Sequence, residues 1–386
     1  MVEKRSKSNK KFMVLSAIGI FMVVDHHTFT ALNLFGSFIP YNSFFMPMFV
    51  FISGYFNKVD GSTNMLKYIG KKLKTLMLPY IALSLLVFGV EQLLNILKTG
   101  EAPSIPSGYL TYVLDRIITI GSFGSIAAPM WFVIALFSTL VFYAIIKRLL
   151  SKIWNSYVML AIFCALHLLT VYIAKTIPSE SLTYFLIPLK ILFFLPFIEL
   201  GVIYRDKLEN KHAGLPGGWK VLLLGLLLVI NMIRTVILPN AYDVAFDSID
   251  DLSGFTSPYI ITPLISAVIG ILFWLTIVDI ISKPLSDSKF VNYMSCNTFW
   301  IMSLHIIFFN IFNLILMLIS ENIISLKYFD SDAFRESEWY FWEISPNIKF
   351  AYVIIGILGP LGVKLIYDKS SSLLIGVLAG KKKEIK

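Results

Sequence analysis

The segment Phe12–Leu32, FMVLSAIGIFMVVDHHTFTAL, decides how the rest of the chain is interpreted. It begins with the composition of a membrane-spanning helix, which needs roughly 20 mostly apolar residues. Asp25, His26 and His27 then follow one another, about 20 Å along such a helix at 1.5 Å per residue. Ionisable side chains are costly in a bilayer and usually mark function, and histidine is the natural proton acceptor for an alcohol near neutral pH. The alternative is a polar helix end that faces the outer headgroups.

The composition is that of a membrane protein. Of the 386 residues 57% are hydrophobic and 15% are charged, whereas about 25% are charged in soluble proteins. The apolar runs are longer than barrel strands and none alternates with period two, which predicts an all-α polytopic protein. The net charge of +9 does not indicate nucleic-acid binding, because Lys and Arg lie in short loops between apolar runs. Cys164 and Cys296 lie in or beside such runs, so we expect reduced cysteines and no disulfide framework.

Ten membrane spans are predicted, and they form a single transmembrane domain over residues 1–386. The basic N-terminus, residues 1–11, resembles the start of a signal peptide. No small-residue cleavage site follows the apolar run after it, so we interpret the first span as a retained helix. The second span is short, which indicates a tilted or partly buried element. The predicted ranges are 12–32, 42–57, 76–97, 130–147, 157–175, 184–204, 219–238, 259–281, 292–319 and 349–367.

Lysine and arginine are concentrated at the N-terminus, in every second loop and in the basic tail, residues 368–386. The positive-inside rule then places both termini in the cytoplasm. Two of the remaining loops are acidic, with Asp243, Asp247, Asp250, Asp251, Asp330, Asp332, Glu336 and Glu338. The long outer loops are 98–129, which contains turn sequences, and 320–348. The run Trp339, Tyr340, Phe341 and Trp342 in the second of these is typical of an interfacial aromatic belt.

Several ionisable residues from separate spans are expected at one depth in the outer half of the membrane. Each alone could snorkel or pair for packing, but as a set they predict a polar cavity open to the outside. They are Asp25, His26, His27, Glu91, Lys190, Arg234 and His305. His167 is more typical of a satisfied core histidine, and Glu199 is the main ionisable residue of the inner half.

Helical geometry separates the neighbouring polar residues of the first span. Asp25 and His27 lie about 200° apart around a helix, so Asp25 does not orient His27. A partner for His27 must come from another helix, and Glu91 is a candidate by depth. His26 is turned about 100° from His27, so we expect the two to do different jobs. The sequence carries no GxSxG, P-loop, GxGxxG or HExxH motif, and we expect no metal site.

Six motifs occur in a recognisable order along the chain: VVDHHT, NSFFMPMFVFISGYF, KTLMLPY, APMWFVIALF, LPFIELG and MSCNTFWIMSLH. In this order they resemble the membrane acyltransferase-3 family over essentially the whole chain. The stretch from Phe45 to Tyr55 is the most specific of them. The resemblance makes His27 the first-span histidine of the family and His305 its late histidine. Asn297 matches the family's asparagine that precedes the late histidine in the same motif. Trp131 matches the family's Trp-Phe element, and Lys74 matches its basic residue before the third span.

One position departs from the family pattern. Many members carry Arg or Lys eleven residues before the first-span histidine, where this chain has Ser16. The donor contact given to that residue would then fall to Lys10 or Lys11. With Lys74, Lys71 and Lys72 they form a basic cluster at the inner face that suits a polyanionic nucleotide.

The resemblance implies a membrane-bound O-acyltransferase in the cell membrane. It would transfer an acyl group, usually acetyl, from cytoplasmic acyl-CoA to a hydroxyl of a cell-envelope or exported glycan. His27 would act as general base, with His305 and Glu91 as further catalytic candidates. The predicted acceptor-binding residues are His26, Asp25, Trp131, Lys190, Arg234 and Asn297.

Two other classes of protein remain open. A polysaccharide or small-molecule carrier would use the polar cavity as its substrate path, but we see no internal pseudo-symmetry of the kind carriers often show. A receptor or scaffold would not need His27. The protein could act alone, as a homo-oligomer or with partners of polysaccharide synthesis.

Overall fold

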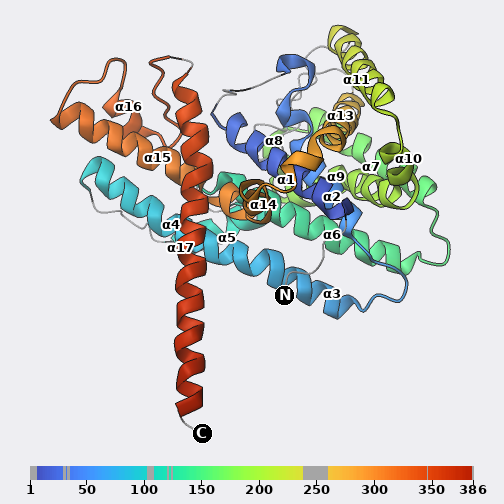
Figure 1. Ribbon diagram of the computed structural model, residues 1–386, viewed down its shortest axis with the longest axis horizontal. Coiled ribbons are helices and arrows are strands. Elements are labelled where there is room, and N and C mark those ends of the chain that lie inside the picture. The colour runs from blue at the N-terminus through green and yellow to red at the C-terminus, as the bar shows by residue number, and fades with distance from the viewer. Residues whose placement is uncertain are drawn as a thin grey trace.

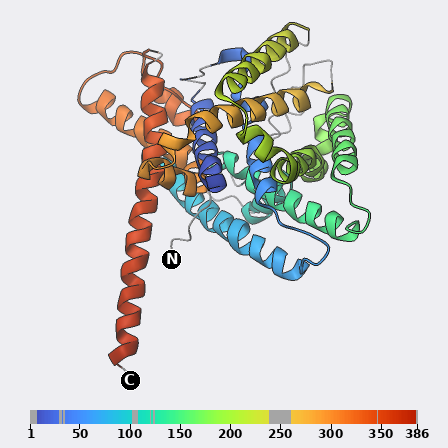
Figure 2. The same cartoon turned by 45° about the vertical axis from the view of Figure 1, so that its right-hand side comes forward.

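The computed structural model describes residues 7–28, 32, 35–101, 108–119, 121–122, 125–237, 260–345 and 347–384. All regular elements of this part of the chain are helices, packed around one another as Figures 1 and 2 show. This confirms the all-α prediction. The longer helices are α1 (Lys7–His26), α2 (Phe45–Phe56), α4 (Leu78–Thr99), α6 (Trp131–Leu149), α7 (Ser156–Thr176), α9 (Leu186–Ile203), α11 (Gly217–Ile237), α13 (Thr262–Leu285), α15 (Thr298–Asn322) and α17 (Ile348–Glu384).

Eight helical stretches of the described chain are long and apolar enough to cross a membrane. They correspond to the predicted spans from the third onward, so the chain is a multi-pass membrane protein. The other two predicted spans fall on α1 and on α2, whose 12 residues agree with the short second span. The total of ten spans and the cytoplasmic placement of both termini stay predictions. Of the acidic residues expected outside, Asp243, Asp247, Asp250 and Asp251 lie outside the described residues.

Several predicted boundaries were wrong. Helix α1 ends at His26, so His27 lies in the turn that follows it. The predicted span 292–319 is two helices, α14 (Lys289–Cys296) and α15, which break at Asn297 because its φ of −121° and ψ of 23° are not helical. The two long loops that are predicted to lie outside also contain short helices, α5 (Tyr109–Thr119) and α16 (Ser331–Glu336).

The basic segment before the third span is helical and not a loop. Helix α3 (Met65–Lys72) continues through a π-helical turn, η3 (Leu73–Met77), into α4. The turn is closed by a hydrogen bond from the Leu78 amide to the Leu73 carbonyl. Pro79 follows at once, and a proline ring collides with the carbonyl four residues before it unless the helix widens there. Lys74 therefore lies on the widened turn, exposed to solvent.

Helices α2 and α9 approach each other closely at the centre of the fold. A β-carbon on Gly54 would lie 2.2 Å from the Ile198 carbonyl oxygen, and one on Gly201 would lie 2.2 Å from the Phe51 carbonyl oxygen. Only glycine fits at both positions, since small residues are what let membrane helices pack backbone to backbone. This contact holds α2, whose Phe45 and Met46 reach the site described below.

Gly201→Ala should therefore destabilise the protein by about 2–3 kcal/mol, the cost of overpacking a tight core. Gly89→Ala is the matched control, because Gly89 lies on α4 and a β-carbon there would meet no neighbouring atom within 4 Å. It should be neutral or slightly stabilising, as alanine is the better helix former. Thermal unfolding in detergent measures both variants, and equal melting temperatures would contradict the close approach.

A buried ion network fixes the other end of α1. Asp279 of α13 pairs with Lys11 of α1 at 2.8 Å and with Lys220 of α11 at 2.5 Å. The Lys11 ammonium also donates to the Tyr204 hydroxyl at 2.9 Å, and its side chain is almost fully buried. Buried charges need such partners. The network ties α1, α11 and α13 together near the N-terminal end of α1, away from the site described next.

Candidate active site

Two histidines from distant parts of the chain meet at the end of α1. His27 Nδ1 and His305 Nε2 lie 3.0 Å apart, and the ring centroids are separated by 4.9 Å. His27 is placed there by α1, while His305 lies two turns into α15 and is fully buried. Segments almost 280 residues apart thus supply the two halves of one hydrogen-bonded pair.

The hydrogen bonds of the pair assign its protons. His305 Nδ1 lies 3.0 Å from the Ile301 carbonyl oxygen, which can only accept, so Nδ1 carries the hydrogen. A neutral imidazole has a single N–H, and His305 Nε2 is then an acceptor. His27 Nδ1 must therefore donate to it. The lone pair of His27 is left on Nε2, which is the arrangement that a general base requires.

A cavity of about 180 Å³ opens onto His27 of this pair. It is formed where the end of α1, the start of α2, the turn before α6 and the segment after α16 meet. Its volume lies below the roughly 300–1,000 Å³ of pockets for drug-sized ligands, so it holds one small ring or group. The lining residues are Val23, His26, His27, Asn42, Phe45, Met46, Ala128, Pro129, Trp131 and Trp339.

A second cavity, of about 190 Å³, lies along α1 toward its N-terminus. It is mostly apolar and includes Ile20, Ile52, Leu76 and Met302 in its lining, with Ser53 and Thr298 as polar groups. Val23 lines both this cavity and the one at the histidines. Leu76 follows two residues after the exposed Lys74. The two cavities therefore adjoin at Val23, one lined by His27 and the other by Leu76 of the π-helical turn.

The comparison with known families decides what kind of protein this is. A sequence profile described as an acyltransferase domain, that of acyltransferase-3, matches residues 12–367. The chain belongs to the acyltransferase-3 family. No curated protein and no solved structure gives a significant match. The resemblance in the sequence motifs is thereby confirmed, and the protein is a membrane enzyme that transfers acyl groups.

Asp25 and His26 have different roles in this acyltransferase. The Asp25 carboxylate is buried and accepts hydrogen bonds from the Leu32 backbone amide, at 3.0 and 3.2 Å. It fixes the chain as it leaves α1. His26 lines the cavity beside His27, with 5.8 Å between the ring centroids, and contacts Phe45 at 5.5 Å. The two histidines thus share the cavity, although the hydrogen bond to His305 belongs to His27.

Trp131 and Lys190 lie together at the cavity wall of the acyltransferase. The Lys190 ammonium lies 4.4 Å from the centroid of the Trp131 ring, a cation–π contact, and its side chain is 1% exposed. Trp131 lines the cavity and Lys190 lies behind it. Lys190 therefore supports the wall and does not line the cavity.

Glu91 lies near the cavity without lining it. Its carboxylate accepts from the backbone amides of Ser125 and Ile126, and Glu338 and Lys98 are its charged neighbours. It is thereby placed to hold the turn that leads to Ala128 and Pro129 of the cavity. The hydrogen-bond partner of His27 is His305. Glu91, which was a candidate for this role by its depth, bonds to the backbone of the turn instead.

Arg234 and Asn297 do not line the cavity. The Arg234 guanidinium donates through Nε to Asn231 Oδ1 at 2.6 Å on its own helix, α11. The Asn297 amide donates to the Tyr293 carbonyl at 2.8 Å and marks the break between α14 and α15. Thr298, the next residue, lines the second cavity.

The expected donor-binding lysines divide into two groups. Lys10 pairs with Asp287 at 2.7 Å and Lys11 with Asp279, so both have carboxylate partners. Lys71 and Lys74 are exposed on α3 and its π-helical turn, and the Lys72 ammonium lies 5.5 Å from the Tyr68 ring centroid. The second group is the one beside Leu76 and the second cavity.

Trp339 is the site residue that the sequence did not reveal. It was expected in an interfacial belt, but its ring centroid lies 5.8 Å from that of His27 and it lines the cavity. Phe341, two residues later, is also buried. The interfacial belt stays a prediction, because hydropathy does not distinguish an aromatic side chain at the lipid interface from one folded back onto a site.

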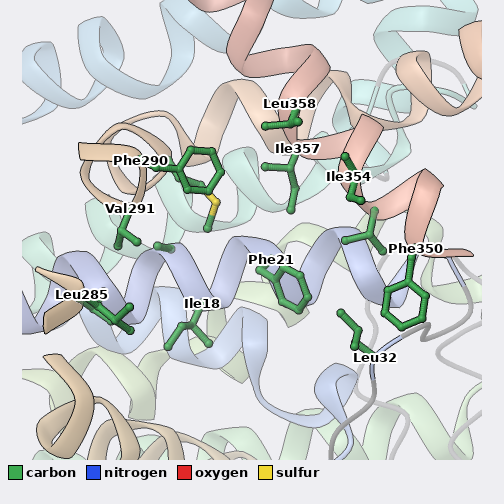
Figure 3. Close-up of a pocket in the computed structure, with 14 residues that line it drawn as sticks. Ile18, Phe21, Leu32, Leu285, Phe290, Val291, Phe350, Ile354, Ile357 and Leu358 are labelled. Carbon is green, nitrogen blue, oxygen red and sulfur yellow. The ribbon is translucent and has the colours of Figure 1, made fainter. Parts of the chain in front are cut away.

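A third cavity, of about 440 Å³, has no catalytic side chain in its lining. It lies between α1, α14 and α17, and Figure 3 shows carbon side chains such as Phe21, Phe290 and Ile357 around it. All the residues that line it are apolar. Phe21 and Val23 are about 200° apart on α1, so this cavity lies on the face away from the second cavity. It offers no base and no group to bind a polar acceptor. Among the described residues, no three His, Cys, Asp or Glu side chains converge to hold a metal ion.

Proposed function

We propose that the protein is an O-acyltransferase of the cell membrane that uses cytoplasmic acyl-CoA, acetyl-CoA in the first instance, as its donor. The acceptor is a hydroxyl of a cell-envelope or exported glycan at the outer side of the membrane. One observation carries this proposal: His27 lines a small cavity while its Nδ1 lies 3.0 Å from His305 Nε2, an arrangement that leaves the His27 lone pair on Nε2.

In this mechanism His27 Nε2 accepts the proton of the acceptor hydroxyl while the oxygen attacks the thioester carbonyl carbon. The tetrahedral intermediate then collapses, the carbon–sulfur bond breaks and the proton passes from His27 to the sulfur. The products are the ester and free CoA, so atoms and charge balance without a further reactant. His305 keeps the His27 ring oriented and stabilises the positive charge that the ring gains.

The donor is proposed to reach His27 through the second cavity. Lys71, Lys72 and Lys74 would attract the phosphates of CoA at the end of α3, since clustered cations raise the local concentration of a polyanion. The mostly apolar lining from Leu76 to Ile20 suits the thin pantetheine chain. The acyl group would then arrive at Val23, next to the cavity that admits the acceptor.

Lys74→Ala should weaken acetyl-CoA binding roughly fivefold at low salt, the value of one exposed charge pair. The effect should shrink at moderate salt, because exposed charges are screened. Lys152→Ala, which removes an exposed lysine between α6 and α7, is the control. Calorimetric titration of the purified protein measures both. Equal affinity in wild type and Lys74→Ala at both salt concentrations would remove Lys74 from the donor site.

The proposed function is tested by acetyl transfer in lipid vesicles. The purified protein is given acetyl-CoA and a pyranoside acceptor, and the acceptor gains the mass of one acetyl group if the proposal holds. The same mass difference should separate the envelope glycans of wild-type cells and cells that carry His27→Ala. Passage of unmodified glycan across the vesicle membrane, without any acetylation, would instead identify a carrier.

A further inference from the structure

Residues 335–342, here called the strap, are held over the histidine pair at several points. At one end the Arg335 guanidinium donates to the Lys98 carbonyl at 3.1 Å, and the Lys98 ammonium donates to the Ser337 carbonyl at 3.4 Å. These bonds fasten the strap to the end of α4.

Helix α15 fastens the middle of the strap. The Asn310 amide donates to the Glu338 carbonyl at 2.9 Å, and the Asn313 amide donates to the Tyr340 carbonyl at 2.8 Å. Both asparagines are fully buried and lie one and two turns beyond His305. The helix that presents His305 thus also sets the position of the residue between those two carbonyls, which is Trp339.

Trp339 is fixed at its side chain as well. Its indole N–H donates to Ser125 Oγ at 3.2 Å, and its ring lies against His27 at an interplanar angle of 45°. Trp131 is the other tryptophan of the cavity, and two residues of α9 contact its ring: the Lys190 ammonium at 4.4 Å from the centroid and the Phe194 ring at 6.3 Å between centroids. The cavity therefore has two fixed indole walls, and flat apolar faces of this kind bind the C–H face of a sugar ring.

The lining of the cavity offers no ionic partner to a charged ligand. None of the ten lining residues is Asp, Glu, Lys or Arg. The charged groups lie behind the walls: Glu338 and Glu91 near Ser125, with Lys98 as their neighbour, and Lys190 over the Trp131 ring. A carboxylate or phosphate in the cavity would lose its hydration without gaining an ion pair in the lining.

We infer that Trp339 is a specificity-determining residue and that the acceptor is a neutral sugar unit. The sugar ring stacks on the Trp339 indole, which places one ring hydroxyl at His27 Nε2. This inference rests on the proposed function and narrows its acceptor to a single uncharged ring, as the cavity volume of about 180 Å³ also requires.

The experiment compares three variants of the purified enzyme in lipid vesicles. Trp339→Leu removes the aromatic wall, Trp339→Phe keeps a ring without the bond to Ser125, and Trp342→Phe is the control. Trp342 lies in the strap but donates to the Lys327 carbonyl and does not line the cavity. The acceptors are methyl glucoside and methyl glucuronide, which differ by one carboxylate. Slow hydrolysis of acetyl-CoA in the absence of sugar reports on the donor and on His27 alone.

Trp339→Leu should raise the KM for methyl glucoside roughly three- to tenfold, the value of one aromatic contact. Trp339→Phe should recover most of this loss, and Trp342→Phe should match wild type both in KM and in acetyl-CoA hydrolysis. Methyl glucuronide should be the poorer acceptor. An unchanged KM in Trp339→Leu, or a preference for the glucuronide, overturns the inference, as does hydrolysis without acetylation of either sugar. Hydrolysis or transfer that survives His27→Ala overturns the proposed function instead.

Discussion

His27→Ala should lower the rate of acyl transfer by roughly 10²- to 10⁴-fold, the usual contribution of a positioned general base. A neutral hydroxyl is a weak nucleophile, and in this protein the lone pair that can take its proton lies on His27 Nε2. The loss corresponds to about 3–5 kcal/mol of the reaction barrier. The measurement is the rate of acetyl transfer by the purified protein in lipid, with acetyl-CoA binding followed in parallel.

Unchanged acetyl-CoA binding and an unchanged melting temperature would show that His27→Ala is still folded. His26→Ala is the matched control, because His26 lines the same cavity without a hydrogen bond to His305. It should cost less activity. An inactive His26→Ala beside an active His27→Ala would move the base by one residue. Full activity in both would place the base elsewhere and favour a carrier.

His305→Ala should cost roughly 10- to 100-fold in kcat, less than the loss of the base itself. Without His305 Nε2 as acceptor, the His27 ring is free to turn and to place its proton on either nitrogen. A residue that orients a catalytic group commonly costs about this much when it is removed. The KM for the acceptor should change little, since His305 does not line the cavity.

His305→Gln separates orientation from direct acid–base chemistry. The glutamine carbonyl oxygen can accept the hydrogen of His27 Nδ1, but it cannot titrate near neutral pH. This variant should recover most of the activity that His305→Ala loses, and its pH–rate profile should keep the ionisation of His27. If His305→Gln were as inactive as His305→Ala, then His305 would itself transfer a proton.

The fold was largely readable from hydropathy because each apolar run of about 20 residues has to form a helix in lipid. The errors lie where hydropathy carries no information about the backbone. Asn297 interrupts an apolar run with a non-helical backbone, and helix α5 lies in a segment that reads as turns. The short apolar run predicted that α2 would be short. Its close contact with α9 could not be predicted, because it depends on the glycine at position 201.

The histidine pair was predictable in part. Ionisable residues are rare in membrane helices, so His27 and His305 were visible as candidates, and their similar depth placed them near each other. Depth also suggested Glu91, Lys190 and Arg234, but it cannot tell which way a side chain points around its helix. Trp339 was not predictable, since its place at the cavity depends on carbonyls of the strap held by Asn310 and Asn313.

The ion network of Lys11, Asp279 and Lys220 has a mechanical consequence. It ties the N-terminal part of α1 to α11 and α13, and the His27–His305 hydrogen bond ties the opposite end to α15, so α1 is held at both ends. Any sliding or tilting of α1 past α13 would leave a buried charge unpaired, at a cost of roughly 3–5 kcal/mol. A rocking cycle that exposes His27 alternately to each side would have to meet that cost at every turnover. A stationary α1 suits an enzyme whose two substrates reach a fixed base from opposite sides, so that only the acyl group crosses the membrane.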